Sequence, residues 1–242
     1  MGAHIFSFYV PSLSAGDTAV EIAGDEHRHL KRVLRLRPGD AVRVTNGTGV
    51  RVSATLEAIG DSVSTARVDR VESSAPPARR LVLALPLLQR AHFDAAVSQC
   101  VELGITELVP VHAERCHVRV WSPSLRTRIE RVAVSAMKQS GGAWLPPVRE
   151  PVDVDGLAGL VAGFALAVVG DAGGAAPAVG GAGTDTLAIV GPEGGFSDRE
   201  IERLTGAGVR RVSLSVNRLR AETAAVVLVA LLARATRVDG EN

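Results

Sequence analysis

The N-terminal part of the chain alternates apolar and polar residues with the two-residue period of β-strands. Val42 and Val44 precede an Asn46-Gly47 pair, and Val50 continues the alternation after it. This arrangement favours a β-hairpin, because Asn-Gly adopts the backbone angles that tight turns require. Similar runs predict five strands, over residues 6–10, 19–22, 41–45, 50–56 and 64–71. We expect these strands to form a small β-barrel.

One helix is expected within this barrel, over residues 25–34. Its apolar edge would consist of His29, Leu30, Val33 and Leu34. Five cations fall within ten residues that contain no acid: Arg28, Lys31, Arg32, Arg35 and Arg37. A positive stripe of this kind follows the phosphates of nucleic acids, although an ordinary solvated face has the same composition.

After a proline-containing linker over residues 73–77, the pattern changes to buried strands alternating with helices. This alternation is typical of a mostly parallel sheet. The expected strands cover residues 81–85, 107–111, 164–169, 187–190 and 212–215, and the expected helices cover 91–103, 123–139, 198–205 and 222–236. Residues 172–183, rich in Gly and Ala, are expected to form a flexible connection. We therefore predict an α/β fold with an N-terminal β-barrel domain (1–73) and a second domain (74–242).

The composition is that of a globular protein: of 242 residues, 46% are hydrophobic and 22% charged, and the formal net charge is +1. The uncharged stretches 157–169 and 224–233 are too short for a membrane span, which needs roughly 20 apolar residues. No secretory signal is visible at the N-terminus, so we expect a cytoplasmic protein with no membrane partner. Cys100 and Cys116 form no Cys-x-x-Cys pair, which disfavours a disulfide framework or a cysteine zinc site.

A glycine-containing loop at 191–195 lies between the expected strand 187–190 and a helix start. Ser197 can cap that helix, and Glu200, three residues later, can complete a capping box. Gly194 and Gly195 let another group approach the main chain closely. The loop has neither the G-x-G-x-x-G pattern of dinucleotide binding nor the Lys-Ser/Thr pair of a Walker loop, which disfavours a phosphate cradle.

Three loops are expected to meet at one edge of the sheet. They follow the strands that end near Val169, Val190 and Ser215. The carboxyl ends of parallel strands form the crevice in which open α/β sheets bind ligands. We therefore expect a ligand held there mainly by main-chain groups.

Arg220 and Glu222 are the candidates for chemistry beside this ligand. As structure, they could be an exposed pair at a helix start, where the helix dipole favours Glu222. As function, Arg220 offers a planar, permanently charged fork that can hold an RNA phosphate or an electron-rich base edge. Glu222 could orient Arg220 or act as a base.

The segments GPEGGFS (191–197) and LRAETA (219–224) resemble the closing motifs of the RsmE family, the bacterial 16S ribosomal RNA uridine-N3 methyltransferases of the SPOUT class. Shorter matches lie at residues 29–35, at Glu102-Leu103-Gly104 and at 139–141. The resemblance therefore covers nearly the whole chain.

The resemblance implies a PUA- or OB-like barrel followed by a methyltransferase domain with a C-terminal trefoil knot over about 164–236. It also implies S-adenosylmethionine as the cofactor, 16S ribosomal RNA or the small ribosomal subunit as the partner, a homodimer, and no metal. The implied cofactor residues are Val169, Gly170, Asp171, Val190, Gly191, Pro192, Glu193, Gly194, Gly195, Leu214, Ser215, Val216, Asn217, Leu219 and Thr223. The implied catalytic residues are Arg220 and Glu222, and the implied RNA-binding residues are Arg28, Lys31, Arg32, Arg35, Arg37 and Arg90.

Two departures from the family pattern concern RNA contacts. Gln89-Arg90 stands where such proteins usually have a Lys, and Gly142 replaces an arginine that often follows Gln-Ser-Gly. Two other functions stay open on the residues alone: a non-catalytic RNA-binding dimer, and a small-molecule enzyme with a nucleotide cofactor. The missing G-x-G-x-x-G pattern counts against the second.

Overall fold

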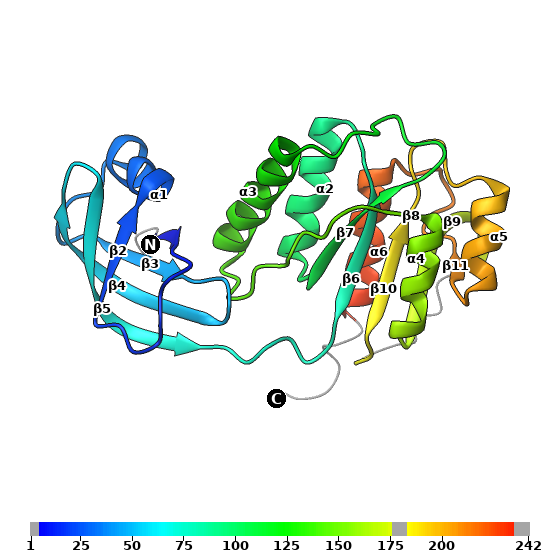
Figure 1. Cartoon of the computed structure of the whole chain (residues 1–242). Helices are drawn as coiled ribbons and strands as arrows, with labels where there is room; N and C mark the ends of the chain where they lie inside the picture. The colour runs from blue at the N-terminus through cyan, green and yellow to red at the C-terminus, as the bar shows by residue number, and fades with distance from the viewer. Residues whose placement is uncertain (1–4, 176–182, 235–242) are drawn as a thin grey trace. The chain divides into compact units, whose positions relative to one another are not determined.

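The structure is a computed structural model that describes residues 5–175 and 183–234 (Figure 1). The chain divides into two compact units. The first contains the residues up to Pro76 together with Met137–Leu145, and the second contains Pro77–Ala136 and the residues from Pro146 onward. The return of 137–145 to the first unit was not predicted from the sequence.

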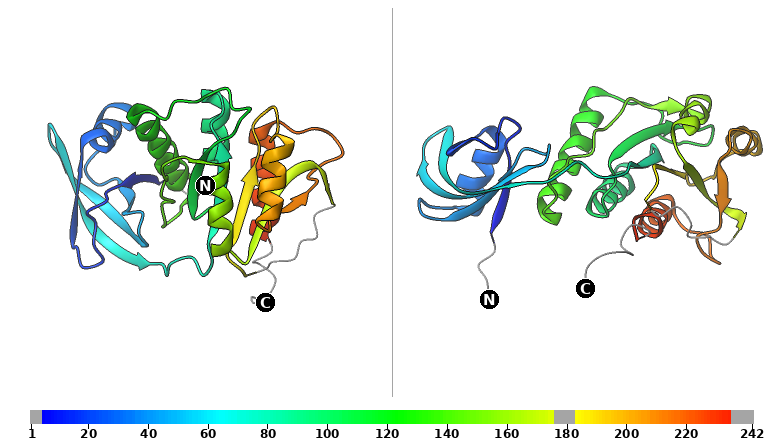
Figure 2. Two further views of the ribbon diagram at one scale, coloured as in Figure 1. Left: turned by 45° about the vertical axis from the view of Figure 1, so that its right-hand side comes forward. Right: turned by 90° about the horizontal axis from the view of Figure 1, so that it is seen from below.

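The first unit is a five-stranded sheet in the order β1-β3-β4-β5-β2. Its strands are β1 (Phe6–Tyr9), β2 (Ala19–Ala23), β3 (Ala41–Thr45), β4 (Val50–Ile59) and β5 (Val63–Ser73). β1 pairs with β3 in parallel, and the other pairs are antiparallel. The sheet curls as a half-barrel around a core that includes Phe8, Ile22 and Leu56 (Figure 2). In the part of the chain that the structure describes, β1 and β2 remain its two open edges.

The helix expected at 25–34 is two short pieces, α1 (Gly24–Arg28) and a π-helical turn, η1 (His29–Leu34). Val33 does not belong to a buried edge, because its side chain is 66% exposed. His27 is buried instead, and its ring nitrogens bond Ser64 Oγ (2.9 Å) and the Asp61 carbonyl (3.1 Å). The predicted apolar edge was therefore wrong at Val33 and at His29, which is also exposed, and it omitted His27.

The predicted hairpin is confirmed, since β3 and β4 pair antiparallel on either side of Asn46-Gly47. Asn46 Oδ1 accepts hydrogen bonds from the amides of Thr48 (2.8 Å) and Val50 (3.0 Å). The returning segment then bonds the loop, because Gly49 N donates to the Ala143 carbonyl at 2.9 Å. A Cβ at Gly49 (φ +101°) would lie 2.6 Å from the Trp144 ring, so glycine is required there.

The second unit contains a six-stranded, all-parallel sheet in the order β11-β9-β10-β6-β7-β8. The strands are β6 (Leu81–Pro86), β7 (Glu107–His112), β8 (Val152–Asp153), β9 (Leu166–Ala175), β10 (Thr186–Val190) and β11 (Arg210–Val212). Every residue of β6 and β10 is buried. Strands covered on both faces have such continuous apolar runs, as the sequence of this unit predicted.

Helices cover both faces of this sheet (Figure 2). They are α2 (Arg90–Glu102), α4 (Val154–Leu160), α5 (Asp198–Gly206) and α6 (Ala221–Arg234), with a short 3₁₀ turn, η2 (Val161–Gly163). The remaining helix, α3 (Pro123–Ser140), contacts α2 through the ion pair of Arg128 with Asp94. Leu157 of α4 and Leu204 of α5 are fully buried in the core of one face. α2 and α6 pack against each other, and α6 packs on β10, β6 and β9. The sequence analysis did not predict α4. None of the helices described is both long and apolar enough to cross a membrane.

β9 differs most from its prediction. The expected strand stopped at residue 169, but β9 continues through Gly170 and Asp171 to Ala175. β11 pairs with both sides of an irregularity in β9, first Arg211 with Val169 and then Val212 with Ala175. A Cβ at Gly174 would lie 2.5 Å from the Val212 nitrogen, so this close crossing requires glycine.

Of the other predictions in this region, one strand had wrong boundaries, and two segments lie wholly or partly outside the described residues. β11 covers 210–212 and not 212–215. Residues 176–182, most of the expected flexible connection, lie outside the described residues, as do the last two residues of the expected final helix. The implied knot stays a prediction.

Candidate functional site

The carboxyl end of the parallel sheet holds a pocket of about 820 Å³, within the range of roughly 300–1,000 Å³ that is common for small-molecule sites. Three segments line it, as the sequence predicted. They are 170–172 from β9, 190–196 after β10, and 213–219 after β11, with Ile201, Ala221 and Ala224 completing the wall. The first segment was predicted as a loop and is instead part of strand β9.

Most of the residues implied as cofactor-binding line this pocket: Gly170, Asp171, Val190, Gly191, Pro192, Glu193, Gly194, Gly195, Leu214, Ser215, Val216, Asn217 and Leu219. Val169 does not, because its side chain is buried in the core beneath the sheet edge. Thr223 is exposed on α6 and is not among the lining residues either. The sequence analysis missed Ala172, Phe196 and Arg218, which also form the wall.

The glycine loop is short and tightly turned. The Gly195 amide donates to the Pro192 carbonyl (2.7 Å), and Gly195 has a positive φ of 70°. A Cβ at Gly191 would lie 3.1 Å from the Phe196 ring. The predicted capping box is confirmed: Ser197 N donates to Glu200 Oε2 (2.8 Å), and Glu200 N donates to Ser197 Oγ (3.4 Å). The loop is therefore fixed at its α5 end.

A second loop, after β7, holds the glycine loop from outside. Arg115 Nη1 donates to the carbonyls of Gly194 (3.0 Å) and Phe196 (3.3 Å). The Glu114 amide donates to Glu200 Oε1 at 2.7 Å, so the capping glutamate also bonds this loop. These residues are about 80 positions apart in sequence, and no local pattern around Arg115 indicates the contact.

Glu193 carries an unsatisfied group in the pocket wall. Its Oε2 atom is buried and has no hydrogen-bond partner within the described ranges. Its carbonyl accepts a hydrogen bond from Arg218 Nη2 at 2.8 Å. Because a buried carboxylate oxygen without a donor is costly, it favours a ligand that brings a donor or a positive charge.

Neither candidate catalytic residue lines the pocket, but each is adjacent in sequence to a residue that does. Arg220 is exposed and follows Leu219. Glu222 Oε1 bonds His92 Nδ1 at 2.6 Å across the contact of α2 with α6. No hydrogen bond or ion pair joins Glu222 to Arg220, both of which the structure describes. The sequence analysis missed His92 as the partner of Glu222.

The sequence of this chain matches known proteins over most of its length. A family model described as an RNA methyltransferase domain matches residues 75–233, and one described as an RNA methyltransferase PUA domain matches residues 22–66. The chain is 33% identical to ribosomal RNA small subunit methyltransferase E of Mycobacterium bovis over 91% of this chain and 88% of the relative. The chain belongs to the ribosomal RNA small subunit methyltransferase E family.

Other members agree in sequence and in structure. The Rickettsia conorii member is 28% identical and covers 92% of both chains. The crystal structure of the Neisseria gonorrhoeae member, bound to S-adenosyl methionine, superposes with a TM-score of 0.85 over 96% of this chain and 98% of that chain, at 26% identity. The family and the fold class predicted from the sequence are thereby confirmed.

The family's PUA match includes the basic stripe, which the fold partly neutralises. Arg28 pairs with Asp25, and Lys31 bonds the Gly60 carbonyl (2.7 Å) and Asp61 (3.2 Å). The sequence shows no acid between residues 28 and 37, but folding brings these acids beside them. The side chains of Arg32, Arg35 and Arg37 are exposed, and none has an ion pair within the described residues. Arg90 is exposed at the start of α2.

The cysteines of this family member are buried and free. Burial raises the pKa of the Cys100 thiol to about 12, so it is protonated at neutral pH and is a poor nucleophile. Among the described residues, no group of three His, Cys, Asp or Glu side chains could hold a metal ion.

Proposed function

We propose that this chain is an S-adenosylmethionine-dependent methyltransferase that methylates N3 of a uridine in the 16S ribosomal RNA of the small ribosomal subunit. The observation that carries this proposal is the pocket at the carboxyl end of the sheet, formed by residues 170–172 within β9, the glycine loop at 190–196 and residues 213–219 after β11. The Neisseria gonorrhoeae relative binds S-adenosyl methionine. The curated relatives are named for the small-subunit ribosomal RNA.

The residues present fit this cofactor. Glycine fits at positions 170 and 191 of the wall because an added Cβ would lie 2.8 Å from Leu214 Cδ1 at Gly170 and 3.1 Å from the Phe196 ring at Gly191. The buried Glu193 Oε2 offers an acceptor to a positively charged or hydrogen-bonding part of the ligand. The pocket residues of the three segments would hold the cofactor, mostly through main-chain groups. When bound, the cofactor supplies a reactive methyl group on a positively charged sulfur.

The protein's own contribution is positioning and charge. Holding two reactants in line is worth roughly 7–11 kcal/mol of the barrier. Uracil N3 must lose its proton before or during attack, which leaves negative charge on the base. Arg220, exposed beside the pocket, would stabilise that charge. Glu222, held by His92, is the candidate proton acceptor. Reaching N3 in a stacked RNA requires turning the base out, at a cost of a few kcal/mol.

The same function leads us to assign RNA-binding residues, an oligomeric state and a location. The half-barrel unit, with exposed Arg32, Arg35 and Arg37, would bind ribosomal RNA around the modified nucleotide, together with Arg90 of the second unit. We also propose a homodimer, a knotted C-terminal segment and a cytoplasmic location, where ribosomal RNA is found. The homodimer and the knot rest on the family resemblance, and the location rests on where ribosomal RNA is found.

Nucleoside mass spectrometry of ribosomal RNA tests the function directly. A strain that lacks the protein should lose one N3-methylated uridine from its 16S ribosomal RNA, and the wild-type gene should restore it. An unchanged set of methylated uridines would contradict the proposal.

Calorimetric titration separates the other two functions. S-adenosylmethionine should bind to the purified protein, and NAD should not. Absence of heat with both would favour the non-catalytic RNA-binding dimer, and heat with NAD alone would favour a nucleotide-dependent small-molecule enzyme.

A further inference from the structure

The arginines of the second unit differ in the partners that their guanidinium groups have. Several guanidinium groups bond carboxylates: Arg80 with Asp185, Arg128 with Asp94, Arg149 with Glu107, Arg203 with Asp155 and, at the pocket wall, Arg211 with Asp171. Each of these pairs cancels its own charge. Three arginines at the carboxyl end of the sheet bond main-chain carbonyls instead, and these we call the arginine rim: Arg115, Arg119 and Arg218.

The arginine rim keeps its positive charge because carbonyl oxygens carry no net charge. Arg119 Nη2 donates to the Glu114 carbonyl at 2.5 Å, and Arg218 Nη2 donates to the Glu193 carbonyl at 2.8 Å. A guanidinium has five N–H donors, so most of the donors stay available. No ion pair to a carboxylate is found for these three residues in the described part of the chain. The side chains are thus held in place but not neutralised.

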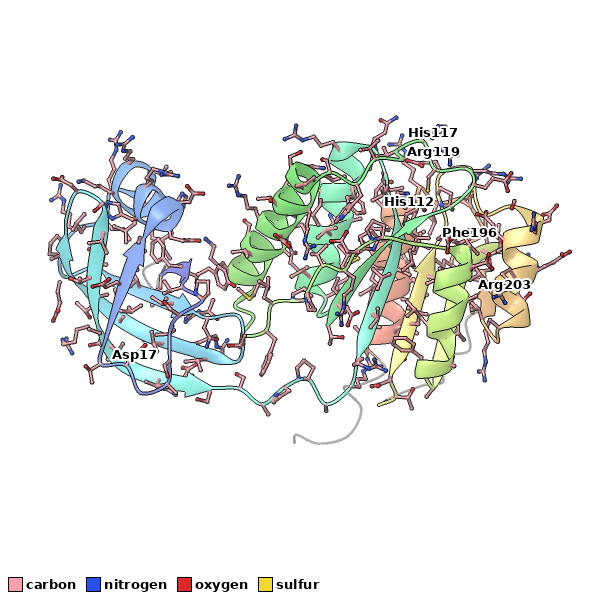
Figure 3. All side chains as sticks on the ribbon, viewed as in Figure 1. Asp17, His112, His117, Arg119, Phe196 and Arg203 are labelled. Carbon is pink, nitrogen blue, oxygen red and sulfur yellow. The ribbon has the colours of Figure 1, made fainter. Side chains whose placement is uncertain are left out.

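Hydrogen bonds connect the rim to the pocket wall. Arg218 itself lines the pocket, and Arg115 bonds the carbonyls of Gly194 and Phe196, which also line it. Arg119 bonds Glu114, whose amide bonds the capping Glu200 at the end of the glycine loop. Figure 3 shows Arg119 on the loop beyond the carboxyl end of β7, whereas Arg203 lies farther along α5.

From these contacts we propose that the arginine rim binds the phosphates of the RNA strand on either side of the nucleotide whose base enters the pocket. Planar guanidinium groups bind phosphate oxygens in pairs, and anchoring lowers the entropy lost on binding. The inference rests on the proposed function and adds a substrate surface on the second unit to the one on the half-barrel. Arg90 and Arg220, exposed at the same end of the sheet, extend the positive charge.

Salt dependence of RNA binding tests the rim. Each phosphate contact on a single strand contributes about 0.7 to the slope of log Kd against log salt concentration. We expect Arg119→Gln and Arg218→Gln each to lower the slope for 16S ribosomal RNA by about this amount. Arg119→Lys, which keeps the charge, should retain most of the wild-type slope. Arg115 is left intact because it also holds the glycine loop.

Arg210→Gln is the matched control. Arg210 is exposed, has no ion pair within the described residues, and lies at the amino end of β11, opposite Val168 of β9. Its removal should leave the slope unchanged. Calorimetry with S-adenosylhomocysteine should give the wild-type affinity within twofold for Arg119→Gln and Arg210→Gln, and circular dichroism should show an unchanged melting temperature.

The outcomes distinguish a failure of the arginine-rim proposal from a failure of the proposed methyltransferase function. If the wild type methylates 16S ribosomal RNA and both Gln variants keep its salt slope, the rim proposal is overturned while the methyltransferase stands. If Arg218→Gln loses affinity only for S-adenosylhomocysteine, Arg218 serves the cofactor and not the RNA. If the wild type neither binds nor methylates the RNA, the proposed function itself fails.

Discussion

The two ends of the parallel sheet are built from different chemistry. At the amino end, Arg80 bonds Asp185 through its amide and its Nε (both 2.8 Å), bonds the Gly163 carbonyl (2.6 Å) and stacks 4.6 Å above the Phe164 ring. At the carboxyl end, Arg211 pairs with Asp171, but the arginine rim bonds carbonyls, and Glu193 Oε2 has no partner within the described residues.

This difference separates stability from function within one sheet. At the amino end, Arg80 and Asp185 satisfy each other, so changing them should alter the free energy of unfolding. At the carboxyl end, where open α/β sheets bind ligands, the arginine rim and Glu193 Oε2 have no partner of opposite charge among the described residues. Changes there should alter binding and rate while the protein stays folded.

Arg220→Ala should have the largest effect. Removing a group that stabilises charge in a transition state commonly lowers the rate by about 10²–10³-fold. We expect a loss of this size in single-turnover methylation of 16S ribosomal RNA, with the affinity for S-adenosylhomocysteine within a few-fold of the wild type. Equal single-turnover rates would remove Arg220 from the mechanism.

Arg115→Ala should weaken cofactor binding without unfolding the protein. It removes two hydrogen bonds to the glycine loop, each worth about 0.5–1.5 kcal/mol. The expected result is a rise of roughly tenfold in the Kd for S-adenosylhomocysteine, with faster hydrogen exchange at residues 191–196. Wild-type affinity together with wild-type exchange would show that the loop holds its shape without Arg115.

Arg80→Ala should lower the stability of the protein and leave its cofactor affinity unchanged. The half-exposed ion pair contributes little, but the stacked Phe164 and the Gly163 carbonyl also lose their partner, so we expect a loss of about 1 kcal/mol. Urea unfolding measures this loss, and cofactor affinity should not change. A fall in cofactor affinity with unchanged stability would contradict the division between the two ends.

The smallest effect concerns acid stability. The hydrogen bonds and charge of Arg80 hold the pKa of the Asp185 carboxyl below its usual value. This stabilises the folded state above the ordinary carboxyl pKa of about 3.9, and the contribution is lost as pH falls toward the lower folded-state value. Asp185→Asn should therefore flatten the decline in stability below about pH 4.

Glu202→Gln is the control for this change, because Glu202 is exposed and has no side-chain partner in the described ranges. An acid decline as steep in Asp185→Asn as in the wild type would show that Asp185 does not contribute.

Local patterns predicted the features that local physics determines. The strand at 41–45, the Asn46-Gly47 hairpin and the Ser197–Glu200 capping box depend on residues a few positions apart, and all three are confirmed. The meeting of three segments at one edge followed from the rule for parallel strands, although the first of them is part of β9 and not a loop.

Long-range contacts account for the rest. β9 continues past Gly170 because β11, about 40 residues later, pairs with it, whereas the composition after Gly170 is that of a loop. The Arg115 contact with the glycine loop and the pair of His92 with Glu222 likewise join distant segments. No pattern within one segment contains that information.

A crystal structure of this chain grown with S-adenosylmethionine tests the central claim most directly. We expect the ligand in the pocket between residues 170–172, 190–196 and 213–219, with Glu193 Oε2 receiving a hydrogen bond or facing positive charge. A ligand bound at the amino end of the sheet, or a pocket that stays empty at saturating concentration, would contradict the account.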